Sequence, residues 1–112
     1  MKKGQNLYKT AKKIILGGNM LLSKRPEMFL PELWPSYFSK AQGISVWDLN
    51  KNKYTDMICA VGQSILGYSN KKLNSKIIKS IKMGNMTTLN CPEEVELSKR
   101  LLSLHPWAQM TK

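Results

Sequence analysis

Apolar residues recur every third or fourth position in three segments of the chain, a spacing that predicts helices. The first segment is residues 6–16, with Asn6 as its expected cap, lysines on its polar face and Gly17-Gly18 at its end. Its predicted buried stripe consists of Leu7, Ala11, Ile14 and Ile15.

The second and third helices are predicted in the last third of the chain. Residues 70–83 are expected to begin at Ser69 or Asn70 and to end at the glycine that follows. The third helix is expected to begin at Pro92, whose ring suits the first helical position, and to end before Pro106. The apolar positions are Leu73, Ile77, Ile78 and Ile81 in the second helix and Val95, Leu97, Leu101, Leu102 and Leu104 in the third.

The middle of the chain has a different pattern, with short runs of β-branched and aromatic residues. Residues 44–48 and 53–58 are two such runs, and the four residues between them are turn formers, so a β-hairpin is predicted. Asn50 and Asn52 are expected to supply the positive φ that such a turn needs.

Residues 19–42 fit neither pattern, because three prolines lie among many apolar residues. Prolines at this density exclude a regular helix or a central strand, so this segment is predicted to be an arm that lies across another surface, such as another subunit. The chain is therefore divided into an N-terminal helix (1–18), a Pro-rich arm (19–42), a hairpin with a loop (43–68) and two helices (69–112). This organisation predicts an α+β fold.

The net charge of +11 raises the possibility of an anionic partner. The Lys face of helix 70–83 could bind nucleic acid or an anionic membrane, and such binding would weaken steeply as salt rises. However, Arg25 and Arg100 are the only arginines, and specific recognition of phosphates and base edges favours arginine. The charge pattern therefore favours a solvated cationic surface over a nucleic-acid or membrane interface.

No pattern typical of catalysis or metal binding is found in the sequence. Asp48 and Asp56 flank the predicted hairpin, where hydrogen bonding to the turns is the expected role. His105 precedes a proline at a helix end and is expected to cap or pack. Gly-rich phosphate loops and metal-ligand spacings are absent from the sequence. The residues by themselves thus predict a small basic unit without an active site.

The cysteines and the hydropathy of the sequence indicate the cellular compartment in which the protein is expected. Cys59 and Cys91 are expected to be two buried free thiols in a reducing environment. Because no apolar run approaches the roughly 20 residues of a membrane span, and the start lacks a signal-peptide cleavage pattern, we expect a cytoplasmic protein.

Several motifs, in their order along the chain, resemble the class III pyridoxal-phosphate aminotransferases. Residues 41–56 read AQGISVWDLNKNKYTD, and their glycine, WD pair and Y-x-D ending resemble the opening hairpin of that family. Residues 62–68 read GQSILGY and resemble the family's loop that leads into a helix. The resemblance is strongest to glutamate-1-semialdehyde 2,1-aminomutases and to a sister group of aminotransferases attributed to surface-polysaccharide biosynthesis. The stretches that resemble the sister group are 28–35, 84–95 and 104–108.

The resemblance implies the N-terminal part of a fold-type I enzyme that uses pyridoxal 5'-phosphate for amino-group transfer. It implies a homodimer, or a pairing with the remainder of the enzyme, and a substrate of amino-acid or amino-sugar type. The family's phosphate-binding segment and Schiff-base lysine would follow Lys112, so these residues alone are expected to be inactive, with no catalytic or cofactor-binding residue among them. Val61, where aminomutases often carry an aromatic residue, favours the sister aminotransferases over the aminomutase reaction.

The resemblance also implies which residues approach the substrate side of the active site or the dimer interface. They follow the hairpin and the first long helix, and they are Ala60, Val61, Gly62, Thr87, Thr88, Leu89 and Asn90. One further alternative is an interaction protein that pairs with a full-length homologue.

Overall fold

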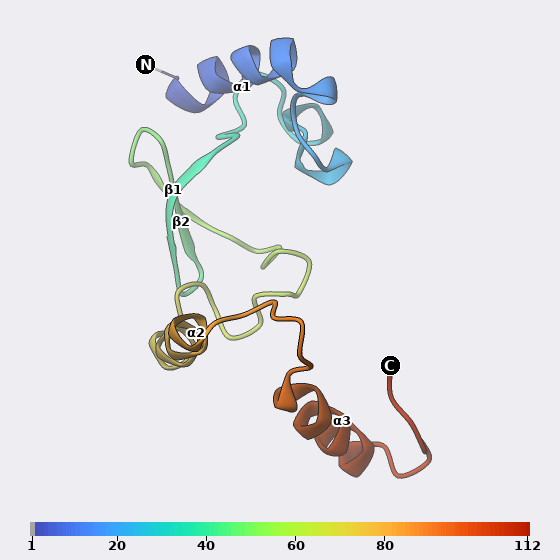
Figure 1. Ribbon diagram of the computed structural model, residues 1–112. Coiled ribbons are helices and arrows are strands. Elements are labelled where there is room, and N and C mark those ends of the chain that lie inside the picture. Colours follow the sequence, from blue (N-terminus) through green and yellow to red (C-terminus); the bar gives the residue numbers. More distant parts are fainter. Residues whose placement is uncertain (1) are drawn as a thin grey trace. The chain divides into compact units, whose positions relative to one another are not determined.

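The computed structural model describes residues 2–112 (Figure 1). The chain divides into two compact units after Ser75. Three α-helices and one small antiparallel sheet confirm the predicted α+β class. The elements are α1 (Lys3–Ile14), β1 (Phe38–Gln42), β2 (Ser45–Asp48), β3 (Lys53–Thr55), α2 (Lys71–Met83) and α3 (Pro92–Leu104). Within the described part of the chain, none of the helices has the length and apolarity that crossing a bilayer requires.

Helix α1 buries Ala11 of the predicted stripe but not its other three residues. It begins at Lys3, so Asn6 lies inside the helix and is not its cap. Its buried residues are Gly4, Tyr8 and Ala11, whereas Leu7, Ile14 and Ile15 stay exposed. The buried stripe faces the arm: Gly4 lies against the backbone of Pro35–Tyr37, at a distance where an added Cβ would make ordinary contacts of 3.6 to 3.7 Å.

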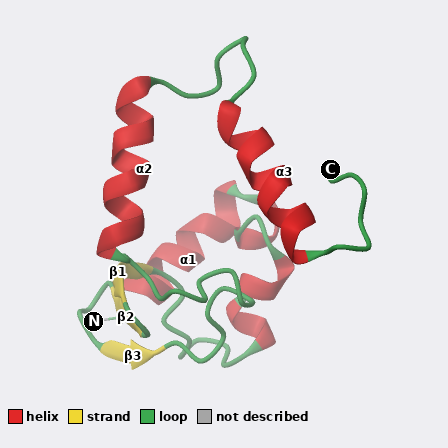
Figure 2. Ribbon diagram, turned by 90° about the horizontal axis from the view of Figure 1, so that it is seen from below, coloured by secondary structure: helices red, strands yellow, loops and turns green. Residues whose placement is uncertain are grey.

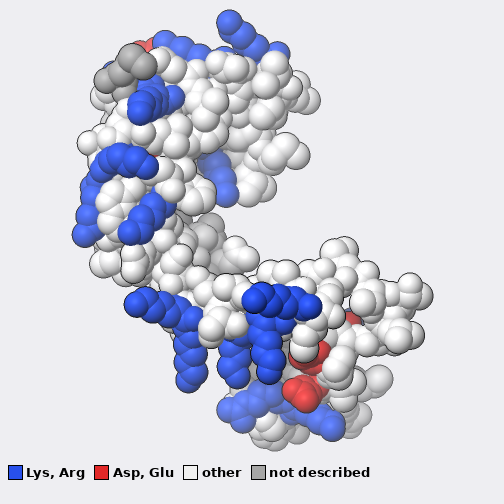
Figure 3. All heavy atoms as spheres, turned by 60° about the vertical axis from the view of Figure 1, so that its left-hand side comes forward, with Lys and Arg blue, Asp and Glu red and all other residues white. Residues whose placement is uncertain are grey.

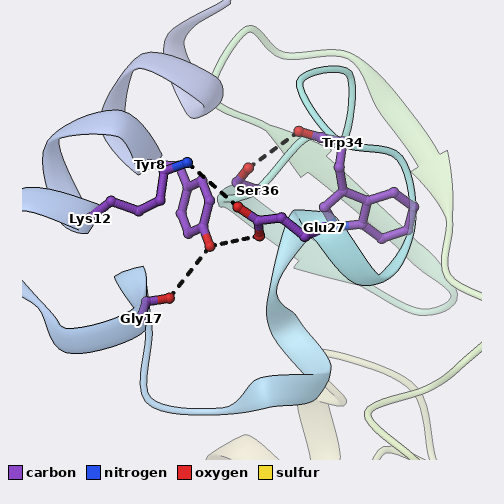
Figure 4. A network of polar contacts seen from close by, with 6 residues as sticks. All are labelled: Tyr8, Lys12, Gly17, Glu27, Trp34 and Ser36. Carbon is purple, nitrogen blue, oxygen red and sulfur yellow. Dashed lines mark hydrogen bonds and ion pairs between the residues drawn. The ribbon is translucent and has the colours of Figure 1, made fainter.

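Tyr8 joins α1 to the segment that follows it (Figure 4). Its hydroxyl donates to Oε2 of Glu27 at 2.9 Å, and Lys12 Nζ lies 3.5 Å from Oε1 of the same carboxylate. Gly17 and Gly18 adopt positive φ just after the helix, as their position in the sequence predicted. This network gives the N-terminal helix a partner although few apolar side chains are buried.

The predicted Pro-rich arm is irregular only as far as residue 37. Short 3₁₀ turns at Leu22–Lys24 and Pro26–Met28 and a stack of Phe29 on Trp34, with ring centroids 4.3 Å apart, occupy its first part. The arm prediction is wrong for Phe38–Gln42, which form β1. After the last proline the backbone N–H groups are free to pair, and β1 uses them against β2.

The sheet has the order β1-β2-β3, with β2 central (Figure 2). The predicted hairpin is confirmed as β2 and β3, with Val46 opposite Tyr54. The positive φ of its turn belongs to Lys51 and not to Asn50 or Asn52. Asn52 instead binds the preceding strand with its amide, which explains why this position is polar.

The ends of α2 and α3 follow the sequence signals. Asn70 Oδ1 accepts from the backbone N–H of Leu73 at 3.1 Å, which confirms Asn70 as the cap of α2. Gly84 ends that helix with φ +98, and α3 begins at Pro92. His105 is confirmed as a capping residue, because its Nδ1 lies 2.9 Å from the carbonyl oxygen of Leu101, where it must donate.

Candidate functional site

Asp48 holds the turn of the hairpin. Its Oδ1 accepts from the backbone N–H groups of Asn50 and Asn52 at 2.8 and 2.9 Å, and its Oδ2 accepts from the Asn52 amide and the Tyr54 hydroxyl. Burial raises the pKa of this carboxyl, but the hydrogen bonds from Asn52, Asn50 and Tyr54 outweigh burial and hold the pKa below its usual value. The predicted role of Asp48 in the turn is thereby confirmed.

Asp56 plays the same role at the base of the next loop, residues 57–67. Its Oδ1 accepts from the backbone N–H of Ile58 at 2.9 Å and of Cys59 at 3.1 Å. Its Oδ2 accepts from the hydroxyl of Tyr68, at the far end of the loop. One carboxylate therefore ties together both ends of a loop of eleven residues, a count that follows from the bounds 57 and 67.

Tyr68 also joins the loop to the tip of the sheet. Gly43 and Tyr68 exchange two backbone hydrogen bonds of 2.8 Å, an isolated antiparallel bridge. Beside it, Gly67 lies so close to Gly43 that an added Cβ would be 3.2 Å from the Cα of Gly43. The loop base is therefore fixed by backbone pairing and by close approach, as well as by Asp56.

We expect Gly67→Ala to lower the free energy of unfolding by about 2 kcal/mol, because it adds both left-handed strain and a tight contact with backbone. Gly43→Ala is the matched control, since its φ of +57 brings the strain but its Cβ would meet nothing within 4 Å. A loss of about 1 kcal/mol is expected there. Urea denaturation followed by circular dichroism measures both, and equal losses would contradict the close approach at Gly67.

The candidates Ala60, Val61 and Gly62 lie in a left-handed turn within this loop. Four consecutive residues have positive φ: +50 at Cys59, +51 at Ala60, +59 at Val61 and +80 at Gly62. The backbone N–H of Val61 donates to Ile58 at 3.0 Å. Left-handed backbone costs an L-residue about 1–2 kcal/mol, and a β-branched residue such as Val61 is an outlier there.

This turn presents its side chains to solvent. Val61 is 86% exposed, and an added Cβ at Gly62 would meet nothing within 4 Å. Cys59, at its start, is half-buried, while Cys91 is exposed, so the prediction of two buried thiols is wrong for Cys91. The strain at Val61 is therefore not offset by burial of its own side chain.

The second group of candidates, Thr87 to Asn90, lies in the loop between α2 and α3, in the other unit. Thr87 Oγ1 donates to the carbonyl oxygen of Leu89 at 2.9 Å, which gives the loop a local turn. Thr88 and Asn90 are exposed, and the Leu89 side chain is 81% exposed. The two groups of candidates thus fall in separate units, each with its side chains open to solvent.

The lysines of the described residues do not fit a Schiff-base site. All sixteen side chains are exposed, and on the face drawn in Figure 3 the cationic side chains stand out from the surface. A lysine that forms an imine needs a site that lowers its pKa, by desolvation or by a neighbouring cation. No group of three or more His, Cys, Asp or Glu side chains in the described chain could hold a metal ion.

Sequence reasoning did not identify the partners that shape these loops. In the sequence, Tyr68 stands out only as the last residue of the motif GQSILGY, and no sequence pattern connects Tyr8 with Glu27. The tyrosine and the carboxylate of each pair are twelve residues apart in Asp56–Tyr68 and nineteen residues apart in Tyr8–Glu27. Separations of this length give no periodic signal, and the partners meet only in the folded chain. The one sequence signal that indicates such a partner is an aspartate directly before a short polar turn.

Comparison with known proteins shows which enzymes this chain resembles. No family model matches the chain. The 3-aminobutyryl-CoA aminotransferase of Cloacimonas acidaminovorans (strain Evry) is 31% identical over 96% of the chain and 26% of the relative. The glutamate-1-semialdehyde 2,1-aminomutase of Wigglesworthia glossinidia brevipalpis is 35% identical over 95% of the chain and 24% of the relative.

A solved structure agrees with these relatives. The internal aldimine form of the FumI protein of Sphingopyxis sp. MTA144, which holds pyridoxal phosphate, superposes with a TM-score of 0.78 and 26% identity. The match covers 88% of the chain and 23% of that protein. This chain matches the N-terminal region of class III pyridoxal-phosphate aminotransferases and aminomutases.

The class III match confirms the resemblance drawn from the ordered motifs, together with the fold and the cofactor of the relatives. The chain spans about a quarter of the length of these class III relatives. These comparisons do not support the alternative in which the lysine face of α2 binds nucleic acid or an anionic membrane.

Proposed function

We propose that this segment forms part of the substrate-side wall of a class III aminotransferase, and that it contributes contacts to a homodimer. The candidate residues are Ala60 to Gly62 in the left-handed turn of one unit and Thr87 to Asn90 in the loop of the other, and each group is proposed by itself for the substrate side or the dimer interface. The substrate would carry the amino group of an amino acid or an amino sugar. The observation that carries this proposal is the anchored left-handed turn, in a chain homologous to these enzymes.

Strained backbone persists only where its surroundings impose it, and such strain is concentrated at active sites and ligand clamps. Here the surroundings are Asp56 and the Gly43–Tyr68 bridge, which fix both ends of the loop. The turn exposes the side chain of Val61 and leaves Gly62 open, so a ligand could approach both closely. A preformed and accessible turn of this kind suits contact with a substrate.

The exposed apolar side chains between residues 16 and 33, which include the first part of the arm, support the proposed subunit contacts. Leu16 is 99% exposed and Met20 88% exposed, and both lie among further exposed apolar residues. Apolar patches of this kind mark interaction surfaces in soluble proteins. The exposed residues in this part of the chain are Leu16, Met20, Leu21, Leu22, Met28, Phe29, Leu30 and Leu33.

The covalent chemistry is assigned to residues outside this segment, because no described lysine is enclosed. Pyridoxal phosphate, when bound, supplies an electron sink for proton abstraction and amino transfer. The residues described here do not fit pyridoxal phosphate, and their proposed role is to shape the space beside the cofactor.

Treating the 112-residue chain with pyridoxal phosphate and borohydride is expected to leave no single lysine selectively labelled. Exposed lysines of ordinary reactivity would react slowly and at many positions. Peptide mapping by mass spectrometry measures the labelling at each lysine. Stoichiometric labelling of one lysine, with turnover of an amino donor, would overturn this assignment.

A chimera tests the wall itself. In the Wigglesworthia glossinidia aminomutase, the aligned quarter would be replaced by this chain, and the chimera would be assayed for cofactor absorbance and for amino transfer. We expect the cofactor to bind and the specificity for amino substrates to change, because the wall is exchanged while the lysine is retained. Exchange of Thr87 to Asn90 alone for the relative's residues should restore part of the original specificity. A chimera with the specificity of the parent would exclude the wall role.

A further inference from the structure

One side-chain hydrogen bond, from the Tyr68 hydroxyl to Asp56, closes the base of the loop 57–67 beside the Gly43–Tyr68 backbone bridge. The Tyr68 hydroxyl donates to Oδ2 of Asp56, while Oδ1 of the same carboxylate accepts from Ile58 and Cys59. The second and third residues of the loop and the residue directly after it therefore share one acceptor group. A carboxylate that accepts three hydrogen bonds is fixed in orientation, and so are its donors.

The left-handed turn begins at one of these donors. Cys59, whose N–H is held by Asp56 at 3.1 Å, is the first of the four residues with positive φ. Its carbonyl oxygen accepts from the N–H of Ser64 at 3.1 Å, so the turn is closed across Gly62. Within the loop, Val61 and Ile65 are each 86% exposed, and their packing supplies little to hold this conformation.

We propose that the Asp56–Tyr68 hydrogen bond is a positioning clamp that holds residues 59–62 in the left-handed conformation and thereby sets the substrate-side wall. Asp56 and Tyr68 are positioning residues and do not contact substrate themselves. The positioning of the turn stands on the geometry of the chain alone, whereas its consequence for substrate rests on the proposed function. The two parts are tested separately.

The clamp is expected to respond to pH at both extremes. The hydrogen bond from Tyr68 is the main cause that lowers the pKa of Asp56, and the hydrogen bond to Asp56 is the main cause that raises the pKa of Tyr68 above 10.0. The other groups that act on Tyr68 are Cys59, which raises its pKa, and Ser64, which lowers it. Ile58 and Cys59 contribute backbone donors to Asp56.

The directions of these two pKa shifts determine how the stability of the clamp depends on pH. A lowered carboxyl pKa means that the stabilisation is present above the unfolded pKa of Asp56 and is lost as pH falls through its folded pKa. A raised phenol pKa means that the stabilisation is present below the unfolded pKa of Tyr68 and is lost as pH rises through its folded pKa. The clamp is therefore closed across the neutral range and opens in strong acid and in strong alkali.

Nuclear magnetic resonance of the 112-residue chain tests the positioning step. The one-bond Cα–Hα couplings of Cys59, Ala60 and Val61 distinguish positive from negative φ. Tyr68→Phe removes only the hydroxyl, and we expect the positive-φ couplings to be lost and the amide signals of residues 57–67 to shift. Tyr54→Phe is the matched control, because it removes a tyrosine–aspartate hydrogen bond of 3.2 Å outside the loop. Its couplings at residues 59–61 should equal those of the unsubstituted chain.

A titration separates a clamp from a general loss of structure. In Asp56→Asn the carboxylate charge is removed while an acceptor oxygen remains, so the pKa of Tyr68 should fall towards 10.0. In the unsubstituted chain the positive-φ couplings should disappear in the same pH range in which Tyr68 ionises, a measurement that needs no variant. Retention of these couplings in Tyr68→Phe, or through the ionisation of Tyr68, would overturn the proposal. Loss of the couplings together with an unchanged chimera activity would support the clamp and reject the substrate wall.

Discussion

Replacing Gly18 by alanine is expected to lower the free energy of unfolding by about 2 to 4 kcal/mol, the largest loss among the glycine substitutions considered. Gly18 is buried and has φ +78, so any L-residue is strained there. An added Cβ would lie 2.7 Å from Cε2 of Tyr8 and 2.8 Å from Cγ of Lys12. Tyr8 cannot withdraw without breaking its hydrogen bond to Glu27.

Gly17→Ala is the matched control for this prediction. Its φ of +73 brings the same backbone strain, but the nearest atom to its added Cβ is the Nη2 of Arg25, the far end of a flexible side chain. We expect a loss of about 1 kcal/mol, from the backbone alone. Thermal and urea denaturation by circular dichroism measure both variants. A loss at Gly17 as large as at Gly18 would mean that the packing of Gly18 on Tyr8 is not as described.

The consequence of such a loss is severe for a chain of this size. Small domains bury a modest share of their surface and are stable by only a few kcal/mol. Among residues 2–112, the buried hydrophobic side chains are Tyr8 and Ala11, both in α1. Gly18→Ala is therefore expected to leave a measurable fraction of the chain unfolded at 25 °C.

The helices could be predicted because their ends are encoded locally. Asn70 caps α2 through its own side chain, Gly84 ends it with φ +98, and Pro92 begins α3. Each signal acts within one turn of the residue that carries it. The hairpin was predictable for the same reason, since its turn lies between two β-rich runs.

The elements that were missed depend on contacts between distant residues. β1 follows a proline-rich segment and is a strand because β2 offers it hydrogen bonds. The buried stripe of α1 includes Gly4 and Tyr8, which meet residues of the arm. Periodicity identifies a helix but does not show which face will find a partner.

The left-handed turn of the candidate site could not be predicted either. Cys59, Ala60 and Val61 all favour negative φ, and no glycine or asparagine precedes Gly62 in the turn. The conformation is imposed by Asp56 and by Tyr68, twelve residues further along the chain. The family resemblance indicated which residues to propose for the site, while the local geometry of these residues required the folded chain.

Val61→Gly is expected to raise stability and to lower function, which is the opposite of what most substitutions do. The strain relieved is about 1–2 kcal/mol, and the greater freedom of glycine in the unfolded chain costs about 0.5–1 kcal/mol, so the net gain is about 1 kcal/mol. Val46→Gly is the matched control in β2, where valine is extended and half-buried, and there a loss is expected.

In the chimera with the Wigglesworthia glossinidia aminomutase, Val61→Gly is expected to lower kcat/KM by about tenfold, because small displacements of a substrate wall are costly. Here no packing offsets the backbone strain. Such strain is expected to persist where function depends on the strained geometry. Denaturation of the 112-residue chain gives the stability, and steady-state kinetics of the chimera give the function. A gain in stability with unchanged kcat/KM would show that the left-handed turn serves no substrate, and a loss of stability would show that Val61 is not strained.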